Sequence, residues 1–303
     1  MANAAAETVL AGAAPQADMV EDALRVTTLL ACRAYLYTLF HKLFGGEPTE
    51  ELMEALGSPL SVDVFDEYAA GDEAMAGVEQ FLLKLREACE DGGNAGALLE
   101  AAKTEYTRLF IGPGELIAYP WESPYVSKQA SVCQESTLAV RAAYRADGLE
   151  PRRLLRVPDD HVSLMCAFMA QGADRTADLL AAGSFRQAAV LLREQERFLN
   201  AHMVGWLPEY ARMARRSKTA VLYPQMIEAA SVFVKLDTTF LSEAAFWLEG
   251  LPEAAFPKGC AASAEAAGPI EHVRTETHRI ADMKLFGLED NELVAVADGT
   301  SAA

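Results

Sequence analysis

The residue types that most often carry catalysis are present in this chain, but they do not occur in the spacing of a known catalytic motif. The five histidines are His41, His161, His202, His272 and His278. None has a glutamate three residues before it, as the di-iron carboxylate sites of helical bundles require. The sequence also has no HExxH or GxSxG motif and no GxxxxGK or GxGxxG phosphate loop. It therefore predicts a protein that is not an enzyme and that holds no cofactor or metal.

The cysteines do not follow a disulfide or zinc-binding pattern either. There are five of them, an odd number, and no two form a CxxC pair. They are Cys32, Cys89, Cys133, Cys166 and Cys260. We expect all five to be free thiols in a reducing compartment.

The first group of residues suited to binding a partner is a helix end that runs into an aromatic loop. The helix end is Glu105–Pro113, and Pro120–Tyr125 follows with Trp121 inside it. Apolar rings beside a carboxylate suit an amphipathic peptide that carries basic residues. The alternative is that these rings only hold the loop against the core, and that Glu105 pairs with Arg108 three residues further on.

A second group, Pro158-Asp159-Asp160-His161, lies at a predicted helix start. One aspartate is expected to cap the helix, because carboxylates interact well with its free amides and its dipole. The other is then free to hold basic residues of a partner, with Trp121 lining the apolar part of the same site. His161 could pair with it as a switchable charge, although a lone histidine there is more often structural.

The third group surrounds His202, in the stretch Phe198–Pro208. His202 continues the apolar stripe of the preceding helix. It is therefore expected to be a hydrogen-bonded histidine of the core.

Net charge narrows the range of partners. The formal charge of −18 over 303 residues would be repelled by phosphates, which argues against nucleic-acid binding. It would attract a basic peptide, or simply keep the protein soluble. The first basic residue is Arg25, so a signal peptide is not expected, and no apolar run is long enough to cross a bilayer. We expect a cytoplasmic protein without stable membrane insertion.

The elements that must position these groups are helices. Alanine is abundant, β-branched runs are scarce, and apolar residues recur at helical spacing. The pattern predicts an all-α protein of about ten helices in two lobes. The expected parts are a disordered tail at 1–19, an N-terminal helical lobe at 20–148, a hinge at 149–158, a C-terminal helical lobe at 159–250 and an extension of unknown role at 251–303.

Taken in order, the motifs resemble the TorD/DmsD family of redox-enzyme maturation chaperones. Members show an E-Y-x-R-L-F-x-G-P segment, then a P-W-E-S-x-Y-like segment, then D-H at a helix start and a later His…Trp-x-Pro stretch. The corresponding segments here are Glu105–Pro113, Pro120–Tyr125, Asp160-His161 with Phe168-Met169, and His202 with Trp206 and Pro208. The resemblance covers roughly residues 20–250.

The resemblance implies a TorD-like helical bundle without catalytic activity. Members bind the twin-arginine leader of a molybdopterin-dependent oxidoreductase, or its mature catalytic subunit, until the cofactor is inserted, and they hinder premature export. Carried over by motif, the peptide-binding positions are Tyr106, Leu109, Phe110, Gly112, Trp121, Glu122, Asp160 and His161. One departure is that many members carry a glutamate four or five residues after the D-H pair, where this chain has Met165 and Cys166.

Three other functions remain open at this point. The chain could be a NarJ-like assembly chaperone of a non-exported nitrate reductase. It could be a nucleotide-binding helical protein, although no phosphate loop supports that. It could also be a structural helical subunit of a mature enzyme.

Overall fold

The computed structural model describes residues 3–67, 73–90, 94–112, 114–127, 135–153, 156–217, 220–251, 264–286 and 291–296. Within these ranges the chain forms twelve α-helices, one π-helical turn and one sheet of two short strands. The predicted all-α fold is confirmed. Two more helices are present than the ten we expected, because short helices form in the aromatic loop and after Trp206.

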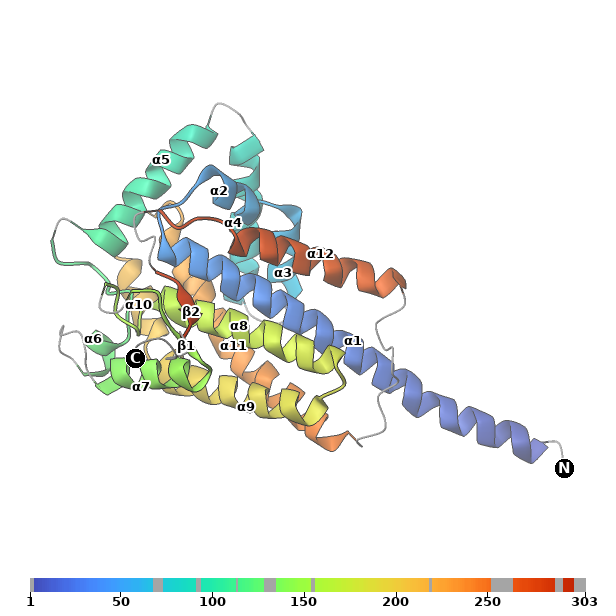
Figure 1. Ribbon diagram of the computed structural model, residues 1–303. Helices are drawn as coiled ribbons and strands as arrows, with labels where there is room; N and C mark the ends of the chain where they lie inside the picture. The colour runs from blue at the N-terminus through green and yellow to red at the C-terminus, as the bar shows by residue number, and fades with distance from the viewer. Residues whose placement is uncertain are drawn as a thin grey trace, which may run out of the picture.

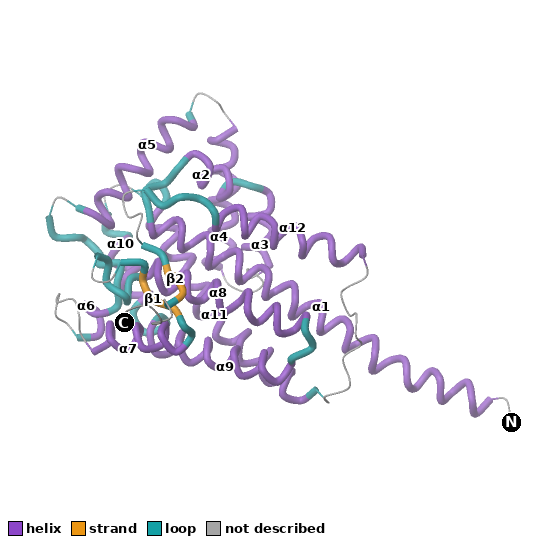
Figure 2. The backbone as a smooth tube through the Cα atoms, in the orientation of Figure 1, coloured by secondary structure: helices purple, strands orange, loops and turns teal. Residues whose placement is uncertain are grey.

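Five long helices build the body of the molecule (Figures 1 and 2). The first, α1 (Asn3–Gly45), packs along α8 (Val162–Ala181) and α12 (Ala264–Ala281). A second set is formed by α9 (Phe185–His202) and α11 (Tyr223–Gly250), and α8 also packs against α9. Apolar residues nearly all round α8 fit its place between α1 and α9.

The remaining helices pack around this body. They are α2 (Glu50–Leu56), α3 (Pro59–Glu67), α4 (Glu73–Glu90), α5 (Ala95–Tyr106), α6 (Ser123–Val126), α7 (Glu135–Ala146) and α10 (Leu207–Ala214). Their ends follow local chemistry. The Thr49 side chain caps α2 by accepting from the Leu52 amide, and Pro208 lies in the first turn of α10.

The N-terminal segment extends α1 beyond its expected start. We predicted a helix from Val20, preceded by a disordered tail at 1–19. The helical backbone begins instead at Asn3 and projects away from the body (Figure 1). Alanine, which is abundant in this segment, has the highest helix propensity of all residues.

The two glycines that end α1 lie where other segments come close to the backbone. Neither has positive φ, which among the described glycines is found only at Gly112, Gly148 and Gly183. A Cβ on Gly45 would lie 2.5 Å from Ser163 Oγ, and one on Gly46 would lie 3.0 Å from the Phe286 amide nitrogen. Small residues are needed here because other segments approach the backbone closely.

The predicted hinge at 149–158 contains a strand. β1 (Leu149–Pro151) pairs antiparallel with β2 (Leu293–Ala295), with Glu150 opposite Val294. The sequence did not predict these strands, since three residues are too few for a recognisable alternation. The pairing connects the C-terminal extension to the middle of the chain.

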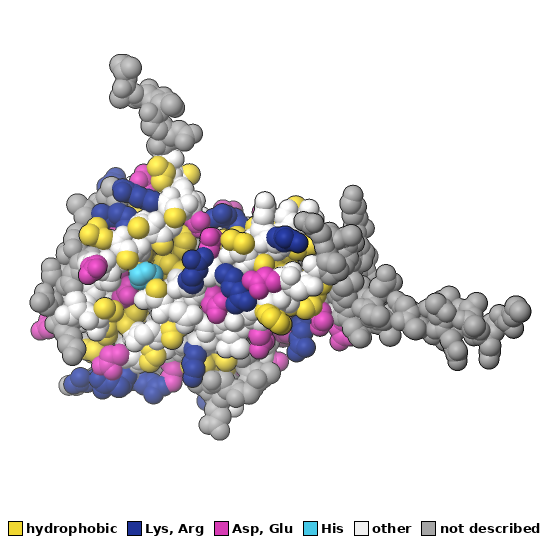
Figure 3. Space-filling model, turned by 90° about the horizontal axis from the view of Figure 1, so that it is seen from below, with side chains coloured by type: hydrophobic (Ala, Val, Ile, Leu, Met, Phe, Trp, Pro, Cys, Tyr) yellow, Lys and Arg dark blue, Asp and Glu magenta, His cyan; other side chains and the backbone are white. Residues whose placement is uncertain are grey.

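A single hydrophobic cluster extends from α1 to α12 and includes residues on both sides of 149–158. The division into two lobes joined by a hinge stays a prediction. On the face seen in Figure 3, acidic and basic side chains lie among apolar ones, so both signs of charge share this face. No helix in the described ranges is both long enough and apolar enough to span a membrane.

A buried polar network joins α1, α8, α9 and α11 at the centre of the core. Arg33 and Asp237 are both fully buried, and the guanidinium donates to both carboxylate oxygens. Tyr37 Oη donates to Asp237 at 2.7 Å, and Gln195 Oε1 accepts from Arg33 at 3.0 Å. Gln195 Nε2 then donates to Thr176 Oγ1 of α8 at 3.0 Å. Because each charge has partners here, the network can be kept in an apolar surrounding.

Two of the five thiols lie among the described side chains. Cys32 and Cys166 are free and buried, as predicted. Burial raises the pKa of the Cys32 thiol to about 12 and raises that of Cys166 further. The side chains of Cys89, Cys133 and Cys260 lie outside the described residues, so the free state of those thiols stays a prediction.

Candidate functional site

The aromatic loop packs against the start of α8, as the sequence predicted. Trp121 and His161 form an isolated antiparallel bridge. The Glu122 amide donates to the Asp160 carbonyl at 3.2 Å, and the Val162 amide donates to the Pro120 carbonyl at 2.8 Å. Trp121, Glu122, Asp160 and His161, which lie about forty positions apart in the chain, are thus brought together in one place.

Asp160 organises the turn that carries Glu122. Its Oδ2 accepts from the Ser123 amide at 2.8 Å and from the Ser123 hydroxyl, and its Oδ1 accepts from Thr137 Oγ1 at 3.2 Å. The Asp160 side chain is fully buried. Its carboxylate therefore fixes the start of α6 and connects it to α7. Ser123 and Thr137 were not predicted as site residues, because hydroxyls at these positions follow no recognisable spacing.

Neither aspartate caps α8, contrary to our expectation. The N-cap is His161, whose Nδ1 accepts from the Ser163 amide at 3.2 Å. Asp159 pairs with Arg141 of α7, and its carbonyl accepts from Tyr144 Oη at 2.9 Å. Both carboxylates bond instead to segments that precede the helix in the chain.

Beneath the loop, the first motif forms a buried aromatic layer. The rings of Tyr106 and Phe110 stack at 4.9 Å, and Phe110 lies 5.3 Å from Tyr223 and 6.5 Å from the His161 ring. Leu109 is buried in the same core. These predicted peptide-binding residues therefore support the loop from inside.

A π-helical turn, η1 (Thr107–Ile111), gives this motif its shape. The Gly112 amide closes the turn by donating to the Thr107 carbonyl at 2.6 Å. Gly112 has a φ of +63°, and a Cβ there would lie 2.9 Å from Leu116. Such turns are rare and frequently occur at functional sites. Pro113, the last residue of the motif, lies outside the described residues.

Glu105 has a structural role that the sequence did not predict. It does not pair with Arg108. Its two oxygens accept from the amides of Val221, Leu222 and Tyr223 at 3.0, 2.7 and 2.9 Å. Glu105 thus caps the N-terminus of α11 with a fully buried carboxylate.

The aromatic loop exposes three large apolar side chains, together with the charged Glu115. Ile111, Ile117 and Val126 are 50%, 40% and 60% exposed. Trp121 is half-buried 5.2 Å from the Tyr119 ring, and its indole N–H has no hydrogen-bond partner among the described residues. Exposed apolar residues grouped on a fixed loop mark a binding surface more often than scattered ones do.

Glu122 connects this surface to α9. His202 Nδ1 lies 3.1 Å from Glu122 Oε2, and Trp206 Nε1 donates to the His202 carbonyl at 2.6 Å. Burial raises the pKa of the Glu122 carboxyl, while the hydrogen bond with His202 opposes the rise. His202 is hydrogen-bonded as predicted, but it is only partly buried and lies at the edge of the core rather than inside it.

Two buried histidines predict how stability depends on pH. Burial lowers the pKa of His41 and of His161 from 6.5 to about 3, helped by the Lys42 charge near the first and by His41 near the second. Both are neutral when folded, whereas the unfolded chain takes up protons below pH 6.5. The stability they contribute is thus complete above that pH and falls toward pH 3. By pH 5 each should remove about 2 kcal/mol from the free energy of unfolding.

Urea unfolding at pH 7.5 and pH 5 measures this loss. The variant His41→Gln should reduce the difference between the two pH values, and the matched variant of exposed His272, His272→Gln, should not. An equal difference in wild type and His41→Gln would contradict the assignment.

The fold and the candidate site define a helical protein whose buried polar residues hold an aromatic loop in place. Comparison with known proteins identifies its class. Residues 71–212 match the family model described as nitrate reductase delta subunit. The chain is 24% identical to the chaperone protein TorD of Vibrio vulnificus strain YJ016 over 209 residues, 69% of this chain and 94% of that protein. It is 23% identical to TorD of Shewanella loihica over 68% of this chain and 90% of that protein.

A second kind of relative matches over a shorter range. The Tat proofreading chaperone DmsD of Salmonella typhi is 26% identical over 114 residues, 37% of this chain and 48% of that protein. No solved structure matches the chain. These matches confirm the resemblance to the TorD/DmsD family. The names of these relatives describe chaperones, which supports a role in redox-enzyme maturation rather than in catalysis.

Proposed function

We propose that this chaperone binds the twin-arginine leader, the apo form, or both, of a molybdopterin-dependent reductase in the cytoplasm. In this role it aids cofactor insertion and hinders premature export. One observation carries the proposal. The aromatic loop carries exposed apolar residues and the half-buried Trp121, and buried hydrogen bonds to Asp160 hold that loop in place.

The chemistry of a leader fits this surface. Its apolar stretch lies against Ile117 and Trp121. One of its adjacent arginines replaces the partly exposed His202 as the partner of the buried Glu122 carboxylate, so binding requires the His202 side chain to move aside. Asp160 and His161 act as positioning residues, since their own polar atoms already bond within the protein.

Titration of a fluorescent leader peptide tests which residues form the site. The variant Trp121→Ala should weaken binding at least tenfold, because a tryptophan at the centre of an interface often carries much of the binding energy. The control is Phe246→Ala, which removes an aromatic side chain that is 74% exposed on α11. Equal affinities for wild type and Trp121→Ala would remove the aromatic loop from the site.

A second candidate function is favoured by the family model itself, whose description names a nitrate reductase subunit. On this alternative the chain is a NarJ-like assembly chaperone of a nitrate reductase that is not exported. A client without a twin-arginine motif, bound through its mature body, would support it. Capture of a leader-bearing reductase would favour the first candidate.

A further inference from the structure

The chain that follows α12 crosses the end of α1. The buried Lys42 amine donates to the Met283 carbonyl at 2.8 Å and lies 3.9 Å from Glu292. The Glu47 amide donates to the Phe286 carbonyl at 2.8 Å. A lysine is seldom buried unless it has a partner, and these contacts give the buried Lys42 its partners.

The same segment then pairs with the middle of the chain. The Arg152 amide donates to the Glu292 carbonyl, and the Val296 amide donates to the Gly148 carbonyl, both at 2.8 Å. The Arg152 guanidinium also bonds the Glu292 carboxylate at 2.5 Å. Glu292 therefore lies between Lys42 and Arg152, two basic residues that are far apart in the sequence.

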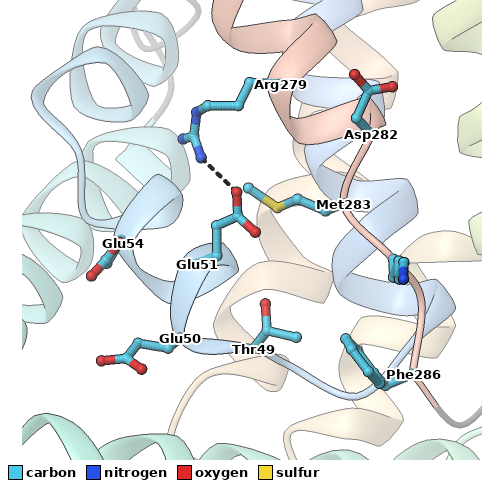
Figure 4. A pocket seen from close by; sticks show the side chains of 9 residues that line it. Thr49, Glu50, Glu51, Glu54, Arg279, Asp282, Met283 and Phe286 are labelled. Carbon is cyan, nitrogen blue, oxygen red and sulfur yellow. Dashed lines mark hydrogen bonds and ion pairs between the residues drawn. The ribbon is translucent and has the colours of Figure 1, made fainter.

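Apolar contacts anchor this crossing. Val273 and Ile280 of α12, with Met283 and Leu285 after it, are buried against the body. Figure 4 shows that Arg279 reaches from α12 to Glu51 of α2, where the two are 3.2 Å apart. The surface between α2 and the end of α12 is an open hollow of about 770 Å³. These contacts of α12 therefore hold the segment that follows it in a fixed position.

We propose that residues 282–286 and 291–296 form a C-terminal strap that fixes the 148–153 segment to the end of α1, and thereby holds the Asp159–His161 turn beneath the aromatic loop. Only seven positions separate Arg152 from Asp159, so greater backbone motion at Arg152 should also increase the motion of Asp159. This gives a role to the extension, which lies beyond the 71–212 range of the family model.

Hydrogen–deuterium exchange of the full chain tests the strap. The variant Val296→Pro removes the amide that donates to Gly148, whereas the matched control Val296→Ala keeps it. Exchange at the Arg152 amide should become about tenfold faster in Val296→Pro and stay at the wild-type rate in Val296→Ala. Glu292→Gln, which weakens both side-chain ion pairs without changing the backbone, should give a smaller increase at the same amide.

Leader binding gives a second measurement and rests on the proposed function. Where wild type binds the leader, Val296→Pro should bind it several-fold more weakly at unchanged helicity. Faster exchange at 148–153 and 159–163 in Val296→Pro supports the strap even when wild type binds no leader. An absence of leader binding by wild type would overturn only the proposed function. Wild-type exchange at Arg152 in Val296→Pro, with the chain folded, would overturn the strap.

Discussion

Replacing Asp237 by alanine is expected to lower the free energy of unfolding by about 3–5 kcal/mol. The substitution leaves the Arg33 guanidinium fully buried without its carboxylate and removes the acceptor of Tyr37. Chemical denaturation followed by circular dichroism measures the loss. The double variant Arg33→Met with Asp237→Leu should recover much of the stability that Asp237→Ala loses. An apolar pair leaves no unpaired charge and needs no desolvation of charge.

A matched control separates burial from charge alone. Glu209 pairs with Arg212 on the surface of α10, and Glu209→Ala should leave the denaturation midpoint unchanged. An Asp237→Ala variant as stable as Glu209→Ala would show that the buried network contributes little to stability.

Replacing Glu105 by alanine is the second substitution expected to have a large effect, about 3 kcal/mol. It removes the acceptor of three amides at the start of α11, and buried amides without a partner are costly. Glu105→Gln should cost less, because its amide oxygen still accepts, although without charge. In thermal unfolding, the midpoint temperature should be highest for wild type, lower for Glu105→Gln and lowest for Glu105→Ala.

The control for the two Glu105 variants lies on the same helix, α5. Glu100 is exposed on α5 and pairs with Lys103, so Glu100→Ala should melt like wild type. If Glu105→Ala also melted like wild type, the cap would not be the reason for a glutamate at this position of the motif.

Much of the helical architecture could be predicted, because it depends on periodicity close in sequence. The sequence pattern indicates a long helix over Met226–Leu248, and α11 begins three residues earlier and ends two later. Ser184 and Gln187 have the spacing of a capping box, which indicates a helix start, and α9 begins at Phe185. The β1–β2 pairing joins segments about 144 positions apart, and such long-range contacts leave no local signal.

The candidate site was predicted only in part, for a related reason. Motif order indicated which residues gather, and Trp121, Glu122, Asp160 and His161 do lie together. Their bonding partners could not be read from the sequence. Glu105 has an arginine three residues away but bonds amides 116 to 118 positions away. A buried acceptor is satisfied by whichever donors the fold brings near it, and sequence distance does not limit that choice.

The central claim is that the wild-type protein binds a twin-arginine leader, and calorimetric titration tests it most directly. The full chain is titrated with a twin-arginine leader peptide from a molybdopterin-dependent reductase, and with a scrambled peptide of the same composition. We predict saturable binding of one leader per chain that weakens as salt is added, because opposite charges contribute to it, and no binding of the scrambled peptide. Equal binding of the two peptides, or no heat of binding with the leader, would contradict the account.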